Sequence, residues 1–375
     1  MGERVSRFDL RRLTITLMPL ALCVLVISSR IIRSGTFFGL DFNLYQPDGR
    51  FYLWEVYRIL GKSNSQAWGQ VTSFYQNLHL VSTHYSSAIS PLNDLGLRRD
   101  MYSRPLYPLL SAPFVAVVGA AGMLVIPILS FIACCYLVVF SFPDDRRKII
   151  AFIGFALFCS SPFILRGFIS DYTDPLLALL VLLAVILLRH KYQNFWIIFS
   201  LSLFGEVTRP SEPLWIIISL LFFISSRKLK FLLLATFHLI FLGMIVLLTP
   251  DSVGTSTRSG YSPLVRIWDF VPHALKIMVV DILEIAVLDR ILLAFLAIYL
   301  FAILRVKRRR RIDYVALALL VVSIAMSAWN GAVGTGWRYE LPSFCPILIT
   351  LIDLIPAKWV DLFNPNVLNG FKKAL

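Results

Sequence analysis

Residues 174–189 read DPLLALLVLLAVILLR, an apolar run with an aspartate at its start and an arginine at its end. Similar runs recur along the chain, which has 375 residues, is 58% hydrophobic and has a mean hydropathy of +0.75. Apolar runs of about 20 residues predict membrane spans, because a helix of that length crosses the hydrocarbon core of a bilayer. The sequence therefore predicts an all-α integral membrane protein with about ten transmembrane helices.

The predicted spans can be given by residue number, with ends that a single sequence defines only to within several residues. They are 13–29, 122–142, 149–165, 175–188, 194–208, 213–225, 231–249, 290–305, 313–328 and 341–356. We expect the first span to remain uncleaved, because no small-residue cleavage site follows it cleanly.

Basic residues between the spans predict the orientation. One set of loops carries most of them: Arg146, Arg147, Lys148, Arg189, Lys191, Arg227, Lys228, Lys230, Arg305, Lys307 and Arg308 to Arg311. The other set of short loops carries only Arg166, Arg209 and Arg338. Loops rich in Lys and Arg stay in the cytoplasm, so both termini of a ten-span chain in the inner (plasma) membrane are predicted to be cytoplasmic.

The net charge of +14 could also suggest binding to nucleic acid. We exclude nucleic acid as a partner, because the basic residues cluster at the ends of apolar runs rather than in a binding stripe.

Two long segments are predicted on the outer side, residues 30–104 and 250–289. The first is a long outer loop in which residues 48–60 predict a helix that stops at Gly61. Residues 105–119 contain three prolines and predict an interfacial helix before the span at 122–142. With no repeat and no low-complexity tract, residues 1–375 are predicted to form a single polytopic domain.

Ionisable residues collect at the outer ends of the spans, where they are costly and need a reason. Three short stretches, 171–175, 206–210 and 337–340, combine acidic, basic and aromatic residues at one predicted depth. Arginines there can bind a phosphate through paired hydrogen bonds, and carboxylates can accept protons. The combination predicts a site for an anionic head group.

Each of these residues also has an ordinary structural explanation. Asp48 could only cap the helix that follows it, and Glu206 and Arg209 could form a structural ion pair. Arg104 and Arg338 could extend to the membrane surface as long cationic side chains do.

Four stretches resemble the GT-C superfamily, the integral membrane glycosyltransferases that use a polyprenyl-phosphate sugar as donor. They are Asp48–Leu53, Tyr102–Leu110, Glu206–Pro210 and Trp337–Pro342, in the order expected for that superfamily. The resemblance covers most of residues 1–350 and is to members of the bacterial type, which act on the cell envelope.

The resemblance implies a reaction in which an acceptor hydroxyl attacks the anomeric carbon of a sugar on a polyprenyl phosphate. Asp48 would be the general base, and Asp171 or Asp174 would orient the acceptor. The implied partners are this donor, a glycan or lipid acceptor, and membrane lipids. The implied substrate-binding residues are Arg104, Glu206, Arg209, Arg258, Trp337, Arg338 and Tyr339.

No cofactor and no metal site are predicted. Many GT-C members carry two acidic residues close together in the first loop, whereas Asp48 stands alone with Asp41 seven residues before it. Arginines are expected to neutralise the leaving phosphate instead, and a divalent metal stays open as an alternative.

Two other classes of function remain as alternatives. A polymerase or ligase of surface polysaccharide also has many spans, but its large outer loop tends to fall later in the chain. A lipid or solute transporter places charged residues near the membrane midplane on broken helices, whereas here they lie at span ends.

Overall fold

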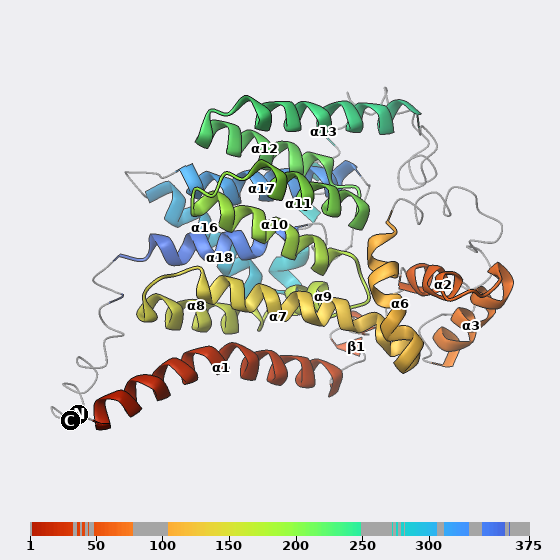
Figure 1. The fold of residues 1–375 in the computed structure, drawn as a ribbon, viewed down its shortest axis with the longest axis horizontal. Helices are drawn as coiled ribbons and strands as arrows, with labels where there is room; N and C mark the ends of the chain where they lie inside the picture. The colour runs from red at the N-terminus through yellow and green to blue at the C-terminus, as the bar shows by residue number, and fades with distance from the viewer. Residues whose placement is uncertain are drawn as a thin grey trace.

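The chain is helical in nearly every residue that the structure describes (Figure 1). The computed structural model describes residues 2–32, 36–37, 40–41, 44, 49–77, 104–248, 272, 275–276, 279–280, 282–305, 311–329, 340–356 and 360. Within these ranges the exception is a pair of two-residue antiparallel strands, β1 (Thr36–Phe37) and β2 (Leu40–Asp41). The predicted all-α fold class is confirmed for the described chain.

The long helices lie side by side in one bundle (Figure 1). They are α1 (Gly2–Ile32), α7 (Val125–Phe140), α8 (Asp145–Phe158), α10 (Asp174–Arg189), α11 (Phe195–Thr208), α12 (Glu212–Ser226), α13 (Leu229–Leu248), α16 (Arg290–Arg305), α17 (Arg311–Trp329) and α18 (Leu341–Leu354). Helix α10 packs against α7, α11, α12, α17 and α18. It is therefore the central element of the bundle, and it contributes side chains to both of the large hydrophobic clusters.

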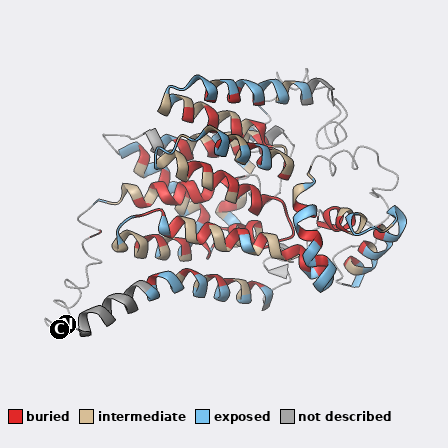
Figure 2. Cartoon of the chain, viewed as in Figure 1, coloured by how far each residue is buried: buried red, intermediate tan, exposed pale blue. Residues whose placement is uncertain are grey.

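Burial follows this arrangement (Figure 2). Helices α10 and α18 are buried along most of their length, whereas α1 and α13 lie at the edges and expose many apolar side chains. Soluble proteins rarely expose apolar surface over whole helices. The exposed residues on these two edges include Leu13, Leu17, Val24, Leu25, Leu233, Phe237, Leu239 and Ile240.

Two helical stretches are long and apolar enough to cross a membrane, Leu13–Ile31 with 19 residues and Leu106–Phe140 with 35 residues. A third would qualify if the bent pair of α8 and α9 (Pro162–Phe168) formed one span. Other apolar helical segments have only 14 to 16 residues: Phe195–Thr208, Glu212–Ser226, Leu229–Met244, Tyr314–Ser327 and Leu341–Leu354. At 1.5 Å per residue such a segment is about 21–24 Å long, which is shorter than a bilayer core of about 30 Å. The predicted number of ten spans is therefore not confirmed by helix length.

The bent pair differs from the predicted straight span at 149–165. Helix α9 (Pro162–Phe168) begins after a break and runs at 96° to α8. Ser161 caps α9, and Asp289 accepts hydrogen bonds from the Ser161 hydroxyl and from the backbone N–H of Phe163. The chain turns here because a proline in the first turn and these bonds satisfy a new helix start inside the bundle.

Three short helices form one end of the molecule, on the right in Figure 1. Helix α2 (Gly49–Ile59) confirms the predicted helix, and Gly61 ends it with a φ of +87°. Helix α3 (Asn64–Asn77) packs on α2, and α2 packs on α6 (Leu106–Val118). Helix α6 is separated from α7 by the 3₁₀ helix η1 (Gly119–Leu124), which starts at Gly119 with a φ of +67°. Glycine accepts this left-handed conformation without strain.

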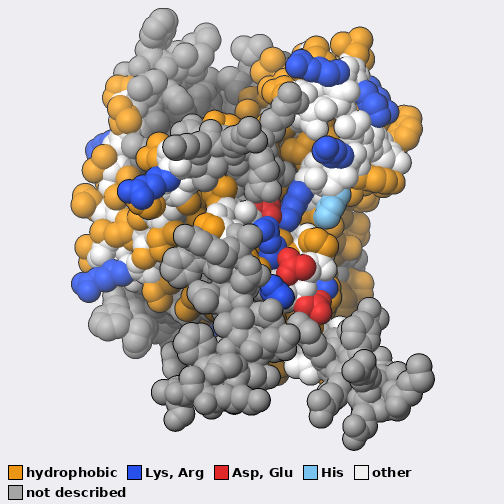
Figure 3. Space-filling view, turned by 90° about the vertical axis from the view of Figure 1, so that its left-hand side faces the viewer, with side chains coloured by type: hydrophobic (Ala, Val, Ile, Leu, Met, Phe, Trp, Pro, Cys, Tyr) orange, Lys and Arg blue, Asp and Glu red, His pale blue; other side chains and the backbone are white. Residues whose placement is uncertain are grey.

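The opposite end of the bundle carries the basic loops (Figure 3). Arg189 at the end of α10 lies 2.9 Å from a carboxylate oxygen of Asp353 on α18, and Arg147 on α8 lies 3.4 Å from the same oxygen. Arg189 also donates to the hydroxyl of Ser141, which follows α7. The ends of four helices thus meet around one buried carboxylate.

We predict that Asp353→Asn destabilises the protein by about 2 kcal/mol, because it removes the carboxylate that Arg189 and Arg147 share. The measurement is the thermal unfolding midpoint in detergent. Asp145→Asn is the matched control, since Asp145 pairs with Lys148 at a partly exposed position and losing that pair should cost at most about 0.5 kcal/mol. Equal midpoints for the two variants would contradict the role given to Asp353.

Candidate functional site

Two aspartates lie at the end of the bundle opposite the basic loops. Asp171 is in the segment between α9 and α10, and Asp174 is the first residue of α10, followed by Pro175. Their exposed fractions are 0% and 1%. A proline in the first turn is compatible with the helix because no N–H is needed there. Both carboxyl groups are thus buried where α10 begins.

Asp171 receives its contacts from the first long loop. The hydroxyl of Tyr75, on α3, donates to Asp171 Oδ2 at 2.6 Å. The backbone N–H of Asp171 donates to the carbonyl oxygen of Leu44 at 3.2 Å. Residues from two parts of the first loop thus hold this aspartate by its side chain and by its backbone.

Gly49 lies directly against Asp171. A Cβ atom built at Gly49 would lie 1.7 Å from Asp171 Oδ2, far inside contact distance. Any side chain at this position would collide with the carboxylate, so the close approach of α2 requires glycine. Gly49 follows Asp48 in the sequence.

Asp174 forms a buried ion pair with Arg209, which lies at the C-terminal end of α11. The exposed fraction of Arg209 is 4%. A buried charge needs a partner of opposite sign, since an unpaired one costs several kcal/mol. The structure thus brings together two of the predicted site residues, which the sequence analysis placed in separate stretches.

Glu206 belongs to a second group of buried ionisable residues on α11, α12 and α13. Its Oε2 accepts a hydrogen bond from the backbone N–H of Ser211 at 3.0 Å, and its Oε1 lies 3.6 Å from Nδ1 of His238. The side chain of Glu212, the first residue of α12, is also buried. Sequence analysis singled out Glu206 but assigned no role to Glu212 or His238.

Arg104 lies at the start of α6, beside the first loop. Its Nη1 donates to the hydroxyl of Tyr52 at 3.0 Å, and the Tyr52 ring packs edge-on against Tyr107. Arg50, on α2, is buried with its guanidinium 4.6 Å from the centre of the Phe51 ring. Arg50 and Arg104, at the end of the molecule formed by α2, α3 and α6, are thus each in contact with an aromatic side chain.

Five predicted site residues lie outside the described residues: Asp48, Arg258, Trp337, Arg338 and Tyr339. Glu340, which follows Tyr339, is described and is buried at the start of α18. The next residue, Leu341, packs on Gly167 of α9, where a Cβ atom would lie 2.9 Å from its side chain. The start of α18 is thus packed beside the segment that leads to Asp171.

The sequence analysis assigned no site role to Tyr75, Gly49, Glu212 or His238. Tyr75 gave no signal, because its partner is 96 residues away. Gly49 could have been noticed as a glycine at a predicted helix start, where it adds no helix stability.

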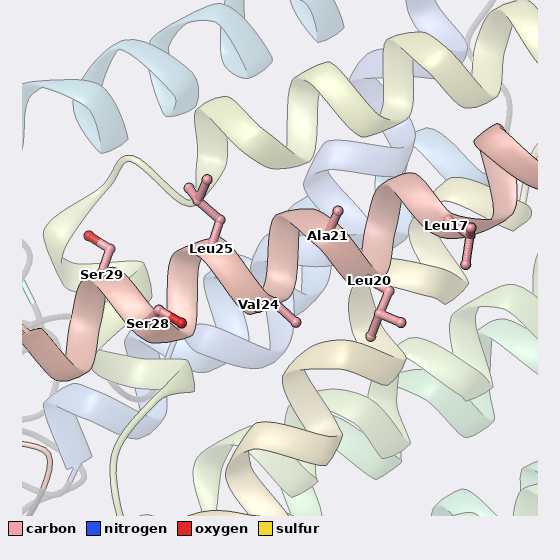
Figure 4. A pocket seen from close by; sticks show the side chains of 7 residues that line it. All are labelled: Leu17, Leu20, Ala21, Val24, Leu25, Ser28 and Ser29. Carbon is pink, nitrogen blue, oxygen red and sulfur yellow. The ribbon is translucent and has the colours of Figure 1, made fainter.

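No metal centre is formed by the described residues: no three His, Cys, Asp or Glu side chains among them are grouped as ligands. A pocket that the structure does contain lies along α1 and is lined by Leu17, Leu20, Ala21, Val24, Leu25, Ser28 and Ser29 (Figure 4). Its lining carries no charged side chain.

Comparisons with known proteins found no matching family model, no similar curated protein and no similar solved structure.

We predict that Tyr75→Phe lowers stability by about 1–3 kcal/mol, because it leaves the Asp171 carboxylate without this buried donor. The loss should appear in the thermal unfolding midpoint and in faster cleavage of the first loop by trypsin. Tyr136→Phe is the matched control, since its hydroxyl donates to Thr16 O at an exposed position. If Tyr75→Phe and Tyr136→Phe behaved alike, the Tyr75–Asp171 bond would not hold the first loop.

Proposed function

We propose that this protein is an integral membrane glycosyltransferase that moves a sugar from a polyprenyl-phosphate donor to an acceptor hydroxyl at the outer face of the membrane. The observation that carries the proposal is the group of buried carboxyl and guanidinium side chains at one end of the bundle, Asp171, Asp174 and Arg209. Transfer from a lipid phosphate needs such groups, to orient the acceptor and to stabilise negative charge on the leaving group.

The proposal includes about ten membrane spans, with the basic end of the bundle in the cytoplasm. Basic residues near span ends favour the cytoplasmic side, and Figure 3 looks onto the end where they gather. Helices shorter than the bilayer core can still span when their flanking turns add length or the bilayer thins locally. The exposed apolar faces of α1 and α13 then face lipid.

We predict that a periplasmic reporter such as alkaline phosphatase is active when fused after Ser211 and inactive when fused after Tyr192. A cytoplasmic reporter such as green fluorescent protein should give the reverse pattern. The two fusion points lie at opposite ends of α11. The same activity at both points would remove α11 from the set of spans, and an inverted pattern would place the acidic end in the cytoplasm.

Asp48 is proposed as the general base that takes the proton of the acceptor hydroxyl. Support comes from Gly49, which follows Asp48 and lies against Asp171. A second acidic group close to the base would help to orient the acceptor. Asp171 is proposed for that role, and its bond from Tyr75 holds the carboxylate in one direction.

Arg209 and Arg338 are proposed to stabilise the charge that develops on the leaving phosphate, with Arg104 and Arg258 as further contacts. Arg209 forms an ion pair with Asp174. A guanidinium has five N–H donors, and one carboxylate uses at most two of them in a paired geometry. Asp174 is therefore proposed to orient Arg209, and Trp337 and Tyr339 to contact sugar or lipid.

We predict that purified protein removes the label from at least one member of a panel of radiolabelled undecaprenyl-phosphate sugars, given a hydroxyl acceptor. Asp48→Asn should lower the rate by about 10²–10⁴-fold, the range for loss of a general base. Asp145→Asn, the same substitution at the opposite end of the bundle, should leave the rate unchanged.

Three other outcomes would count against the proposal. A folded protein that turns over no donor would remove the transferase assignment. Normal transfer by Asp48→Asn would remove the base role and leave Asp48 as a helix cap. Label that crosses a vesicle membrane while still attached to its lipid would indicate a flippase.

A further inference from the structure

The basic residues at one end of the bundle fall into two groups that differ in their partners. The first group lies on α8 and at the end of α10, and aspartates neutralise it. Arg147 and Arg189 share the carboxylate of Asp353, and Lys148 pairs with Asp145. These pairs join α8, α10 and α18 to one another, so the first group has a structural role.

The second basic group has no acidic partner. It follows α10 and joins α12 to α13, and its members are Lys191, Arg227, Lys228 and Lys230. All four are exposed, and none forms an ion pair with another residue that the structure describes. Residues 189–205 and 213–248 contain no Asp or Glu. The upper part of Figure 3 accordingly shows basic side chains without acidic side chains beside them.

Aromatic side chains lie next to the second basic group. The Nζ atom of Lys230 is 5.4 Å from the centre of the Phe195 ring, at the start of α11, and 5.9 Å from that of Phe231. Trp196 is 70% exposed and Tyr192 is 47% exposed. Exposed Trp and Tyr are typical of the level at which lipid headgroups lie. The starts of α11 and α13 thus meet at this level.

Exposed apolar side chains continue from the second basic group along both helices. On α13, Leu229, Leu233 and Phe237 are spaced by four residues, so they share one face, and all three are exposed. On α11, Leu203 and Phe204 are exposed as well. Acyl chains can pack on these side chains while the headgroup of the same lipid contacts the basic group.

Two members of the second basic group have a backbone conformation that favours glycine. Lys191 has a φ of +56° and Arg227 has a φ of +59°, and they are the non-glycine residues with positive φ in the part of the chain that the structure describes. Arg227 is the C-cap of α12, next to the position at which helices commonly end with glycine. Glycine would adopt this conformation with less strain, so the two basic side chains are present at a cost to the backbone.

Membrane orientation does not account for the difference between the two groups. The orientation of a membrane protein depends on the number of Lys and Arg residues in its short loops, and acidic residues contribute little to it. Both groups therefore favour the cytoplasmic side equally well. The absence of acidic side chains from the second group leaves its positive charge available to an external anion.

We propose that the second basic group binds the phosphate headgroup of an anionic phospholipid of the cytoplasmic leaflet, whose acyl chains lie along the exposed faces of α11 and α13. Lysines at the membrane surface attract anionic lipids, and the flexible, exposed side chains of Lys228 and Lys230 can reach one phosphate from the start of α13. The inference rests on the membrane placement proposed above. It does not rest on sugar transfer, which is assayed separately and assigned to the opposite end of the bundle.

The test is native mass spectrometry of the full-length protein, purified in detergent with equal amounts of phosphatidylglycerol and phosphatidylcholine. The wild type should retain phosphatidylglycerol in preference to phosphatidylcholine, and the preference should fall as ionic strength rises. Lys228→Gln with Lys230→Gln should lower the ratio of the two retained lipids by about 5–25-fold, since each basic residue near an anionic surface contributes about fivefold.

Two further variants separate a defined site from general attraction to a basic surface. Arg146→Gln with Lys148→Gln removes the same charge from the first group, at the same end of the bundle, and should keep the wild-type ratio. Lys228→Arg with Lys230→Arg should also keep it, because the charge is retained. The lysines of the second group are exposed and outside every ion pair described, so their variants are expected to fold, which size-exclusion chromatography checks.

Three results would overturn the proposal. The first is a wild type that retains both lipids equally. The second is an equal loss of preference in the two glutamine variants, since the whole basic end would then attract lipid without a site. The third is displacement of the retained phosphatidylglycerol by inorganic phosphate, because the group would then bind a free anion and the apolar faces would contribute nothing.

Discussion

The central helix α10 has an ion pair at each end, buried at its start and partly buried at its end, and the rest of the bundle is arranged around it. Asp174 pairs with Arg209 of α11 at one end, and Arg189 pairs with Asp353 of α18 at the other. Between them the helix is apolar, and α10 contacts α7, α9, α11, α12, α17 and α18. A buried charge is stable only with a partner. The two pairs therefore require that Arg209 at the end of α11 lies beside the start of α10, and that Asp353 near the end of α18 lies beside the end of α10.

The same constraint explains why the acidic end of the bundle can serve as a site. Apolar helices supply no polar partners along their length, so polar side chains gather where helices begin and end. Asp171 finds its partners in Tyr75 and Leu44 of the first loop, which closes over the end of the bundle. The described part of the first loop and the acidic end therefore stabilise each other, and Asp171 is shielded from bulk water.

Much of the local structure was predictable from the sequence. The helix predicted at 48–60 and the break near Gly119 both appear, because glycine and proline act through the local backbone. The turn between α8 and α9 was not predicted, since its apolar run continues to residue 165 and the partner that caps the new helix, Asp289, is more than 120 residues away. The sequence analysis named Asp171, Asp174 and Arg209 as site residues and assigned no such role to Tyr75, Glu212 or His238.

The sequence by itself determined that the chain is helical and apolar, and that its charges lie near helix ends. Composition and periodicity are local properties, and they act on each helix separately. Only the tertiary structure decided which ionisable groups are neighbours: Asp174 and Arg209, Arg189 and Asp353, and Glu206 and His238. Partnership depends on which helices pack together, and many apolar helices of similar composition can pack in more than one order until their polar groups are paired.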